Sequence, residues 1–580
     1  MKARMDIAEQ QAAPNVGSAS TNTPSGASGL SFIVHRSSFI ILTLIVVVAI
    51  ALRVIGLGDV PPPFFRDEAE KGYNAWCLWK TGADYEGRRL PLFINVFGAY
   101  TSAIYQYATA PLVGIFGLKV WTVRLTAALV GIATVVFLYL LARALLDLPT
   151  ALVAAAVLAI SPWHVHFSRW AQQGIFMPLL FTLAAWGTVR FRQGWRAGLP
   201  IAAAAIGLSA YAYDVGRVLA PLFLLLLVAV ARRDLRQCKV WAIVSALVLA
   251  IFVAPTLWFV IHQPDEALAR FRRISIAQPG MLPAQVVGQF VVNYAKHFDP
   301  IYLAFRGDRE PRHSIGKTGE IYPLELPFLL LGIYFLARRR NAACGELGRA
   351  AAAMIIGWIA IAPVASSMTN VGIPHALRSL AAVPAFALAI AVGLVESVRL
   401  VPDKAGKISI ISLLVFAELI LMGCSAFYYF KIYPSTSVEV WQCGFKEALD
   451  CCRKEHWPGP DSSRVEPEIW ITESVGGLAL PPEMISPLEI FVAFYWPIPP
   501  REFQKNRLGG IPLRIVRWGT NINDLLTQPN RPPIFAIVRA GEIRKEIANQ
   551  IDLRRYFLPL REGWPISSYY LFPIPALDRK

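Results

Sequence analysis

The sequence predicts an all-α polytopic membrane domain of about eleven transmembrane helices, followed by a small α/β domain. Of its 580 residues, 55% are hydrophobic and only 16% are charged, which is more apolar side chain than a soluble core can bury. Apolar stretches of about 20 residues, the length that crosses a ~30 Å hydrocarbon core, recur as far as Phe430. Residues 431–580 contain no such stretch, so we place the main domain boundary after Phe430.

Residues 1–37 are rich in Ala, Ser, Thr, Asn and Gly, and no apolar run begins before Phe39, which predicts a disordered cytoplasmic leader. The run at 38–57 is too long for a signal peptide and has no convincing cleavage site after it. We therefore expect it to open a transmembrane domain that covers 38–430. The predicted spans are 38–57, 122–144, 150–167, 173–190, 198–213, 216–231, 240–261, 324–338, 350–366, 378–398 and 408–430.

The net charge of +17 is dispersed between the apolar segments and forms no single basic stripe, which argues against nucleic acid as a partner. If residue 1 is cytoplasmic, nearly every short cytoplasmic connection is basic, as the positive-inside rule requires. This orientation puts the loops 58–121 and 262–323 and the tail 431–580 outside. The basic residues of the cytoplasmic connections are Arg143, Arg190, Arg192, Arg196, Arg232, Arg233, Arg236, Lys239, Arg338, Arg339, Arg340, Arg349, Arg399, Lys404 and Lys407.

The external segments carry their own patterns. Tyr100–Gly117 is apolar and aromatic with a proline inside, and an extra span there would break the charge pattern, so we expect it to lie in the membrane interface. The tail has β-branched and aromatic runs at 468–472, 511–518 and 533–538, which predict strands, and a helical pattern at 440–454. The tail is therefore predicted to be an extracytoplasmic α/β domain.

Seven cysteines form no CxxC pair, so a structural zinc site is not expected. A disulfide in the tail is left open, although Cys443 and Cys451 would lie about 12 Å apart on a continuous helix, too far to bridge.

Two adjacent carboxylates, Asp67 and Glu68, follow the first predicted span at the outer membrane surface. One carboxylate can take a proton from an attacking hydroxyl while its neighbour or a bound cation tunes its pKa. The structural alternative is an acidic pair at a helix N-terminus, where the macrodipole favours negative charge. The spacing alone favours this alternative.

Ordered motifs change this balance. They are Arg66-Asp67-Glu68-Ala69; Thr81-Gly82-Ala83-Asp84 with Gly87 and Pro91; Phe116-Gly117 with Val123-Arg124-Leu125; Ser161-Pro162-Trp163-His164 with Phe167-Ser168-Arg169; Glu320 to Pro327; and Ile373-Pro374-His375-Ala376-Leu377-Arg378. Each motif is loose, but in their order and topology they resemble the bacterial GT-C membrane glycosyltransferases, family 39-like, which include protein O-mannosyltransferases and lipid A aminoarabinose transferases. The resemblance covers about 38–430.

This resemblance implies an inverting glycosyltransferase that moves a sugar from a polyprenyl-phosphate carrier to an acceptor hydroxyl at the outer face of the bacterial inner membrane. The family's catalytic base falls on Asp67, with Glu68 beside it. Arginines at the outer ends of spans suit the departing phosphate. The candidates for binding it are Arg378, Arg169 and Arg217, each with a structural alternative as a headgroup anchor. Asp84, Asp214 and His375 are further candidates, and an ion pair with Arg217 is the structural alternative for Asp214.

One departure concerns metal binding. Relatives often carry an acidic residue shortly after the arginine that matches Arg169, whereas this chain reads Trp170-Ala171-Gln172-Gln173-Gly174. Four histidines lie on the same side, but scattered interfacial histidines more often satisfy local hydrogen bonds. They are His164, His166, His313 and His375. We assign no metal ligand, and participation of a divalent cation is left open.

Two other classes of function compete. A transporter or flippase for lipid-linked or polar solutes would need charges deep within its spans and matching broken helices, whereas here the clear charges cluster at the external ends. A non-catalytic assembly partner would use tail aromatics such as Trp470, Tyr495, Trp496 and Trp518 to stack on sugar, although such residues more often form core. The expected acceptor is a lipid, glycan or protein hydroxyl.

Overall fold

The computed structural model describes residues 26–339, 345–438, 440–456, 468–472, 484–508, 511, 513–516, 521, 523–524, 534–539 and 569–574. Most of the predicted leader, and Trp518, lie outside these residues. The chain divides into two units. The first ends at Leu44, and the second begins at Ile45. The described part of the first unit is helical and belongs to α1 (Gly26–Val54); all further elements belong to the second unit.

Every predicted span coincides with helical structure, which confirms a mostly helical, multi-pass protein. In the described residues, seven helices are long and apolar enough to cross a membrane, and α5 and α8 are shorter apolar helices. The count of eleven spans stays a prediction. The helices concerned are α1, α4 (Val120–Leu145), α5 (Leu148–Ile160) with α6 (Pro162–Phe167), α7 (Phe176–Arg192), α8 (Gly198–Ala212), α9 (Gly216–Gln237), α10 (Lys239–His262), α13 (Glu325–Arg339), α14 (Gly345–Ile361), α17 (Val383–Arg399) and α18 (Lys404–Phe427).

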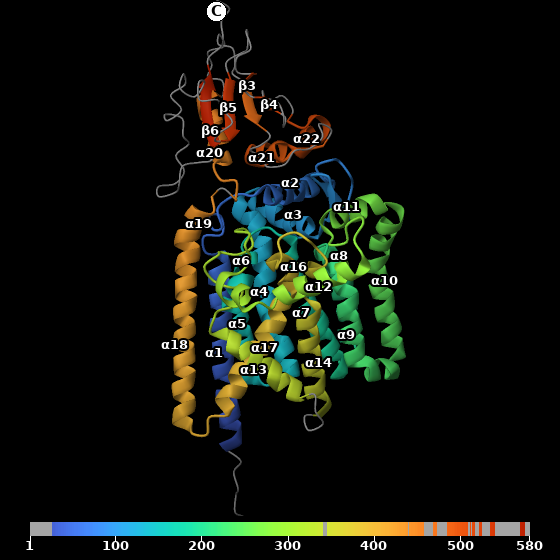
Figure 1. The fold of residues 1–580 in the computed structure, drawn as a ribbon, viewed down its shortest axis with the longest axis vertical. Helices are drawn as coiled ribbons and strands as arrows, with labels where there is room; N and C mark the ends of the chain where they lie inside the picture. Colours follow the sequence, from blue (N-terminus) through green and yellow to red (C-terminus); the bar gives the residue numbers. More distant parts are fainter. Residues whose placement is uncertain are drawn as a thin grey trace, which may run out of the picture. The chain divides into compact units, whose positions relative to one another are not determined.

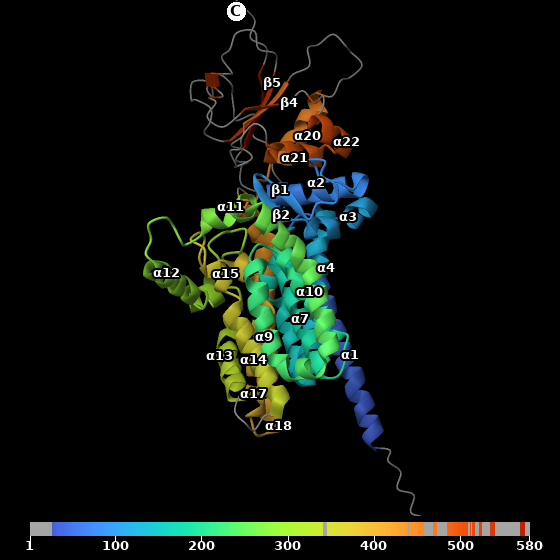
Figure 2. The ribbon, with the colours of Figure 1, turned by 90° about the vertical axis from the view of Figure 1, so that its right-hand side faces the viewer.

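The central helices run side by side, as α7, α9 and α10 do in Figure 2. Small residues permit the closest contacts, because a helix without bulky side chains lets a neighbouring backbone approach. Gly332 on α13 and Gly393 on α17 face each other so closely that a Cβ on Gly332 would lie 1.8 Å from the Ala389 carbonyl oxygen. These two helices therefore depend on glycine at their crossing.

The first long loop folds into α2 (Arg66–Thr81), a hairpin of β1 (Phe93–Val96) and β2 (Ala99–Ser102), and α3 (Ile104–Phe116) (Figure 1). The segment expected at the interface, Tyr100–Gly117, thus comprises most of β2 and all of α3. At 13 residues α3 is not among the helices long enough to span. Its interfacial location stays a prediction.

The second long loop contains α11 (Pro264–Ile274), α12 (Pro283–Lys296) and the π-helical turn η2 (Ile301–Arg306). It is tied to the segment that follows α15 (Val364–Ser367), because the Asn293 amide donates to the carbonyl oxygens of Ser367 and Thr369, at 3.2 and 3.0 Å. This connection fixes the approach to the short helix α16 (Ala376–Ser379).

The tail follows η5 (Tyr428–Ile432) and α19 (Tyr433–Thr436) with three helices: α20 (Phe445–His456), α21 (Pro487–Tyr495) and α22 (Pro500–Asn506). The three predicted strands are present as β3 (Glu468–Thr472), β4 (Leu513–Val516) and β5 (Ile534–Arg539); the sequence analysis missed β6 (Tyr569–Ile574). The sheet order is β4-β3-β5-β6, with β3 parallel to β4 and β5 and with β6 antiparallel to β5. The tail's extracytoplasmic location stays a prediction.

The tail contacts the first loop directly. The Tyr73 hydroxyl on α2 donates to the Ile498 carbonyl oxygen at 2.8 Å, and the rings of Phe64 and Phe494 lie 4.7 Å apart. Gln504 on α22 also donates to the Asp84 carbonyl oxygen at 2.8 Å. One face of α2 is therefore covered by α21 and α22.

The α13–α17 crossing yields a test of the helical packing. We expect Gly332→Ala to destabilise the protein by about 1–3 kcal/mol, because the added methyl group must push the two backbones apart. Gly423→Ala on α18 is the control, since nothing lies within 4 Å of a Cβ at Gly423. Thermal unfolding in detergent measures both variants, and equal melting temperatures would contradict the close crossing.

Candidate functional site

Asp67 lies in the first turn of α2. Its side chain is 35% exposed, and one carboxylate oxygen lies 3.7 Å from Nε of Arg66. Acidic side chains are common in the first turn of a helix, where the helix dipole is favourable to them. The carboxylate is thus accessible at the start of α2.

The neighbouring Glu68 is completely buried and paired with Arg124 of α4. Arg124 donates through Nε and Nη2 to the two carboxylate oxygens, both at 2.8 Å. The backbone amides of Ala171 and Phe65 donate to the same oxygens, at 2.9 and 3.3 Å. Glu68 therefore has a full set of partners inside the protein.

Arg124 also holds the chain that leads into α2. Its remaining donors contact the carbonyl oxygens of Pro61 and Pro62, at 2.7 and 3.2 Å. A bidentate guanidinium–carboxylate pair is strong and directional, and burial strengthens it further. The start of α2, and with it Asp67, is consequently fixed to the N-terminal end of α4.

Several guanidinium groups surround Asp67. Arg312 stacks on the Phe65 ring with its central carbon 4.2 Å from the ring centroid. Burial lowers the pKa of Arg66, and so does the charge of Arg312, while Asp67 opposes this shift. The interaction with Tyr213, and then with Asp214 and Asp67, raises the pKa of Arg270 on α11. Asp67 is therefore within electrostatic reach of arginines from both long loops.

Asp214 joins two of the basic residues. It lies 3.8 Å from Arg217 and 3.5 Å from Arg270. The Arg217 side chain is mostly covered, stacks on the Phe93 ring and lies 3.4 Å from the Ala267 carbonyl oxygen. The expected Asp214–Arg217 ion pair is thus present, while the Arg270 side chain remains 44% exposed.

Arg378 and His375 lie together at α16. Arg378 is buried and donates to the Thr369 hydroxyl at 2.7 Å and to the Val371 carbonyl oxygen at 2.9 Å. Its charge interacts with Tyr213, Arg270 and Asp308, so it belongs to the same group as the basic residues around Asp67. The structure thus brings Arg378 close to Arg270, which the sequence analysis did not single out.

Two other predicted candidates, Arg169 and Asp84, form hydrogen bonds with nearby backbone groups. Arg169 is buried and donates to three carbonyl oxygens, those of Leu52, Ile55 and Val60, at 2.7 to 3.2 Å. Asp84 accepts from the backbone amides of Glu86 and Arg88, both at 2.9 Å, and thereby shapes a turn. Neither residue presents its charge to the group around Asp67.

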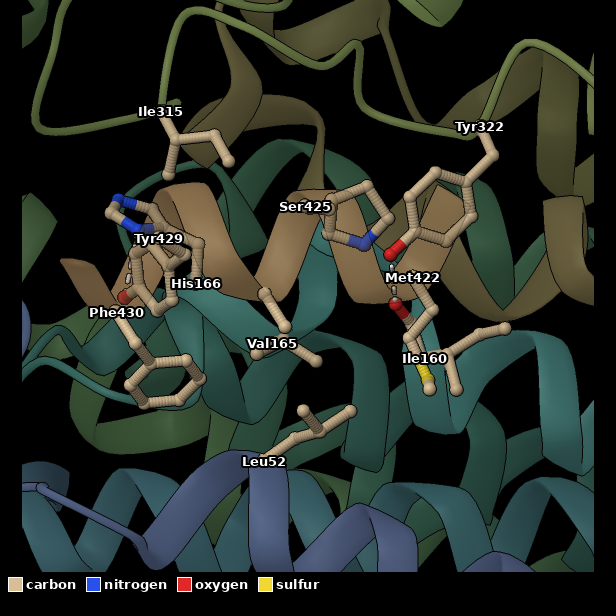
Figure 3. A pocket seen from close by; sticks show the side chains of 12 residues that line it. Leu52, Ile160, Val165, His166, Ile315, Tyr322, Met422, Ser425, Tyr429 and Phe430 are labelled. Carbon is tan, nitrogen blue, oxygen red and sulfur yellow. Dashed lines mark hydrogen bonds between the residues drawn. The ribbon is translucent and has the colours of Figure 1, made fainter. Parts of the chain in front are cut away.

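A small cavity of about 30 Å³ lies between α18, α5 and α6 (Figure 3). His166 contacts the Tyr429 hydroxyl at one end, and the Tyr322 hydroxyl donates to the Ile160 carbonyl oxygen at the other. The space is sufficient for one or two water molecules. A larger apolar groove of about 420 Å³ lies between α5, α13, α17 and α18.

Comparison with known proteins gives a consistent fold. The dolichyl-phosphate-mannose-protein mannosyltransferase family matches residues 102–258. No curated protein matches by sequence. ArnT from Cupriavidus metallidurans in the apo state is 12% identical with a TM-score of 0.50, over 94% of this chain and 98% of that chain. The structure of the same protein bound to undecaprenyl phosphate is also 12% identical with a TM-score of 0.50, over 96% of this chain and 100% of that chain.

A further similar structure is the Archaeoglobus fulgidus oligosaccharyltransferase in its apo form, which is 15% identical with a TM-score of 0.47. It matches over 75% of this chain and 62% of that chain. The ArnT likeness supports the GT-C fold that the motifs had predicted, and the family match covers residues 102–258.

The buried pair leads to a stability prediction. Glu68→Ala leaves Arg124 as an uncompensated buried charge, which typically costs about 3–5 kcal/mol. Asp265→Ala removes an exposed ion pair with Arg272 on α11 and should change stability by less than about 1 kcal/mol. Thermal unfolding in detergent compares the two variants. A Glu68→Ala protein as stable as Asp265→Ala would show that the pair does not anchor α2.

Proposed function

We propose that this protein is an inverting glycosyltransferase that moves a sugar from a polyprenyl-phosphate carrier to an acceptor hydroxyl at the outer face of a bacterial inner membrane. The observation that carries the proposal is the accessible Asp67 carboxylate on a helix fixed by a buried ion pair, within reach of several arginines. A base beside a cluster of cations suits a reaction in which a hydroxyl loses a proton and a phosphate departs.

The proposed mechanism begins at Asp67. Its carboxylate accepts the proton of the acceptor hydroxyl while that oxygen attacks the anomeric carbon of the sugar. The bond between the anomeric carbon and the carrier phosphate oxygen breaks with inversion, and the phosphate leaves with the bonding electron pair. General base catalysis of this kind contributes about 10²–10⁴-fold to the rate.

We assign Glu68 a positioning role instead of a catalytic one, because Arg124 and two backbone amides occupy both of its oxygens. Arg270 and Arg378 are our candidates for the departing phosphate. Arg270 is the stronger of the two, since its side chain remains 44% exposed, whereas Arg378 is largely occupied by local acceptors.

The similar structures support a lipid-phosphate partner. ArnT has been captured with undecaprenyl phosphate, and the matching family is named for a dolichyl-phosphate-mannose donor. We extend the shared chemistry, a sugar on a polyprenyl phosphate, to this chain. The acceptor is a lipid, glycan or protein hydroxyl of the cell envelope.

Asp67→Asn tests the base directly. The amide is nearly isosteric but cannot accept the proton, so turnover should fall about 10²–10⁴-fold while membrane insertion is retained. The measurement is sugar transfer by the purified protein from a polyprenyl-phosphate-sugar fraction of membranes to a membrane extract. Asp265→Asn on the exposed face of α11 is the control. Normal turnover by Asp67→Asn would exclude Asp67 as the general base. Solute flux without sugar transfer by the wild type would favour a transporter.

Arg270→Gln tests the phosphate assignment. Loss of one charge that stabilises the leaving group should reduce turnover by about 10²–10³-fold, with Arg270→Lys recovering part of it. Arg272→Gln is a matched control, since it removes an exposed arginine two residues further along the same helix. Equal activity of Arg270→Gln and Arg272→Gln would show that Arg270 does not stabilise the departing phosphate.

A further inference from the structure

Three side chains meet where the second long loop approaches α16. Two of them belong to the loop and the third precedes the helix. Asp308 and His313 lie in the segment 307–324, and His375 immediately precedes α16. Their potential ligand atoms all lie within 4.8 Å of one another. Asp308 and His375 are buried, and the His313 side chain is 15% exposed.

The spacing of these atoms matches a metal coordination shell. Nδ1 of His313 lies 3.3 Å from Oδ2 of Asp308, and Nδ1 of His375 lies 3.8 Å from the same oxygen. In a tetrahedral site with metal–ligand bonds of about 2.0–2.1 Å, neighbouring ligand atoms are about 3.3–3.4 Å apart. The two distances from the Asp308 oxygen are therefore within roughly half an ångström of this spacing.

Two imidazole nitrogens of this cluster lack hydrogen-bond partners among the residues that the structure describes. They are Nδ1 of His313 and Nδ1 of His375, both of which are buried near the Asp308 carboxylate. Buried polar atoms are seldom left without a partner, and two such atoms aimed at one carboxylate point to a missing ligand.

The surroundings also hold the three groups in place. The Ala376 amide donates to Oδ2 of Asp308 at 2.8 Å, and the Glu310 amide donates to Oδ1 at 2.9 Å. The His313 ring lies against the rings of Phe167 and Trp170 and 4.5 Å from the ring of His375. Such outer contacts orient metal ligands before the ion binds.

We propose that Asp308, His313 and His375 bind one divalent transition-metal ion of the Zn²⁺ class, with a fourth position left for water. Two imidazoles and one carboxylate suit Zn²⁺, whereas Ca²⁺ and Mg²⁺ favour oxygen ligands. No metal was assigned from the sequence, because scattered interfacial histidines more often satisfy local hydrogen bonds and His313 and His375 are 62 positions apart. The ion ties the second long loop to the start of α16, which carries Arg378.

Metal binding by the purified full-length protein tests the proposal without reference to activity. After treatment with a chelator, the wild type should take up one equivalent of Zn²⁺ in competition with a chromophoric chelator, and Co²⁺ should give the visible spectrum of a tetrahedral site. Asp308→Asn and His313→Ala should each weaken Zn²⁺ binding at least tenfold. His262→Ala, at an exposed position on α10, should leave it unchanged.

The controls separate binding from folding. Added Zn²⁺ should raise the melting temperature of the wild type and of His262→Ala but not of Asp308→Asn, which conserves the shape of the side chain. If His313→Ala fails to fold, Asp308→Asn alone decides the question. Wild-type affinity no higher than that of Asp308→Asn, or an unaltered melting temperature with Zn²⁺, would overturn the metal site.

Discussion

The ion pair between Glu68 and Arg124 is the constraint on which the candidate site depends. Two charges without solvent contact are unfavourable unless hydrogen bonds satisfy them, and here the carboxylate has four donors while the guanidinium also holds the Pro61 and Pro62 carbonyls. Successive side chains on a helix diverge by about 100°. Because Glu68 must point into the bundle, Asp67 points elsewhere, towards the second long loop, which carries Arg270.

The charges around Asp67 are unbalanced, and the imbalance has a chemical meaning. Five arginines have four acidic neighbours among the described residues: Arg66, Arg217, Arg270, Arg312 and Arg378 against Asp67, Asp214, Asp308 and Glu310. Partly covered cations repel one another unless an anion neutralises them. A phosphate supplies that charge and matches the planar guanidinium group, so this arrangement suits a lipid-phosphate substrate better than a neutral solute.

The sequence was sufficient for the helices and the motif-bearing loop, because hydrophobic runs of membrane length and basic connections are local signals. It was insufficient for the roles of neighbouring residues. Asp67 and Glu68 look equivalent in the sequence, and only the position of Arg124 on α4 distinguishes them. Arg169 resembled a phosphate ligand until the structure showed its donors on the carbonyls of Leu52, Ile55 and Val60. The sequence did not distinguish Arg270 from Arg272 and Arg273, which lie on the same amphipathic loop helix.

The site is assembled from loop segments whose helices are held in place by contacts with distant parts of the chain. The first loop is held by Arg124 on one side and by the tail helices α21 and α22 on the other. The second loop is held through Asn293 and, around Asp308, through the backbone of Ala376. Each connection links a loop to an element distant in sequence, so the loops have defined positions only when the whole domain is folded. Long loops on this fold can thus take defined positions, because buried polar contacts replace the apolar core that such short segments lack.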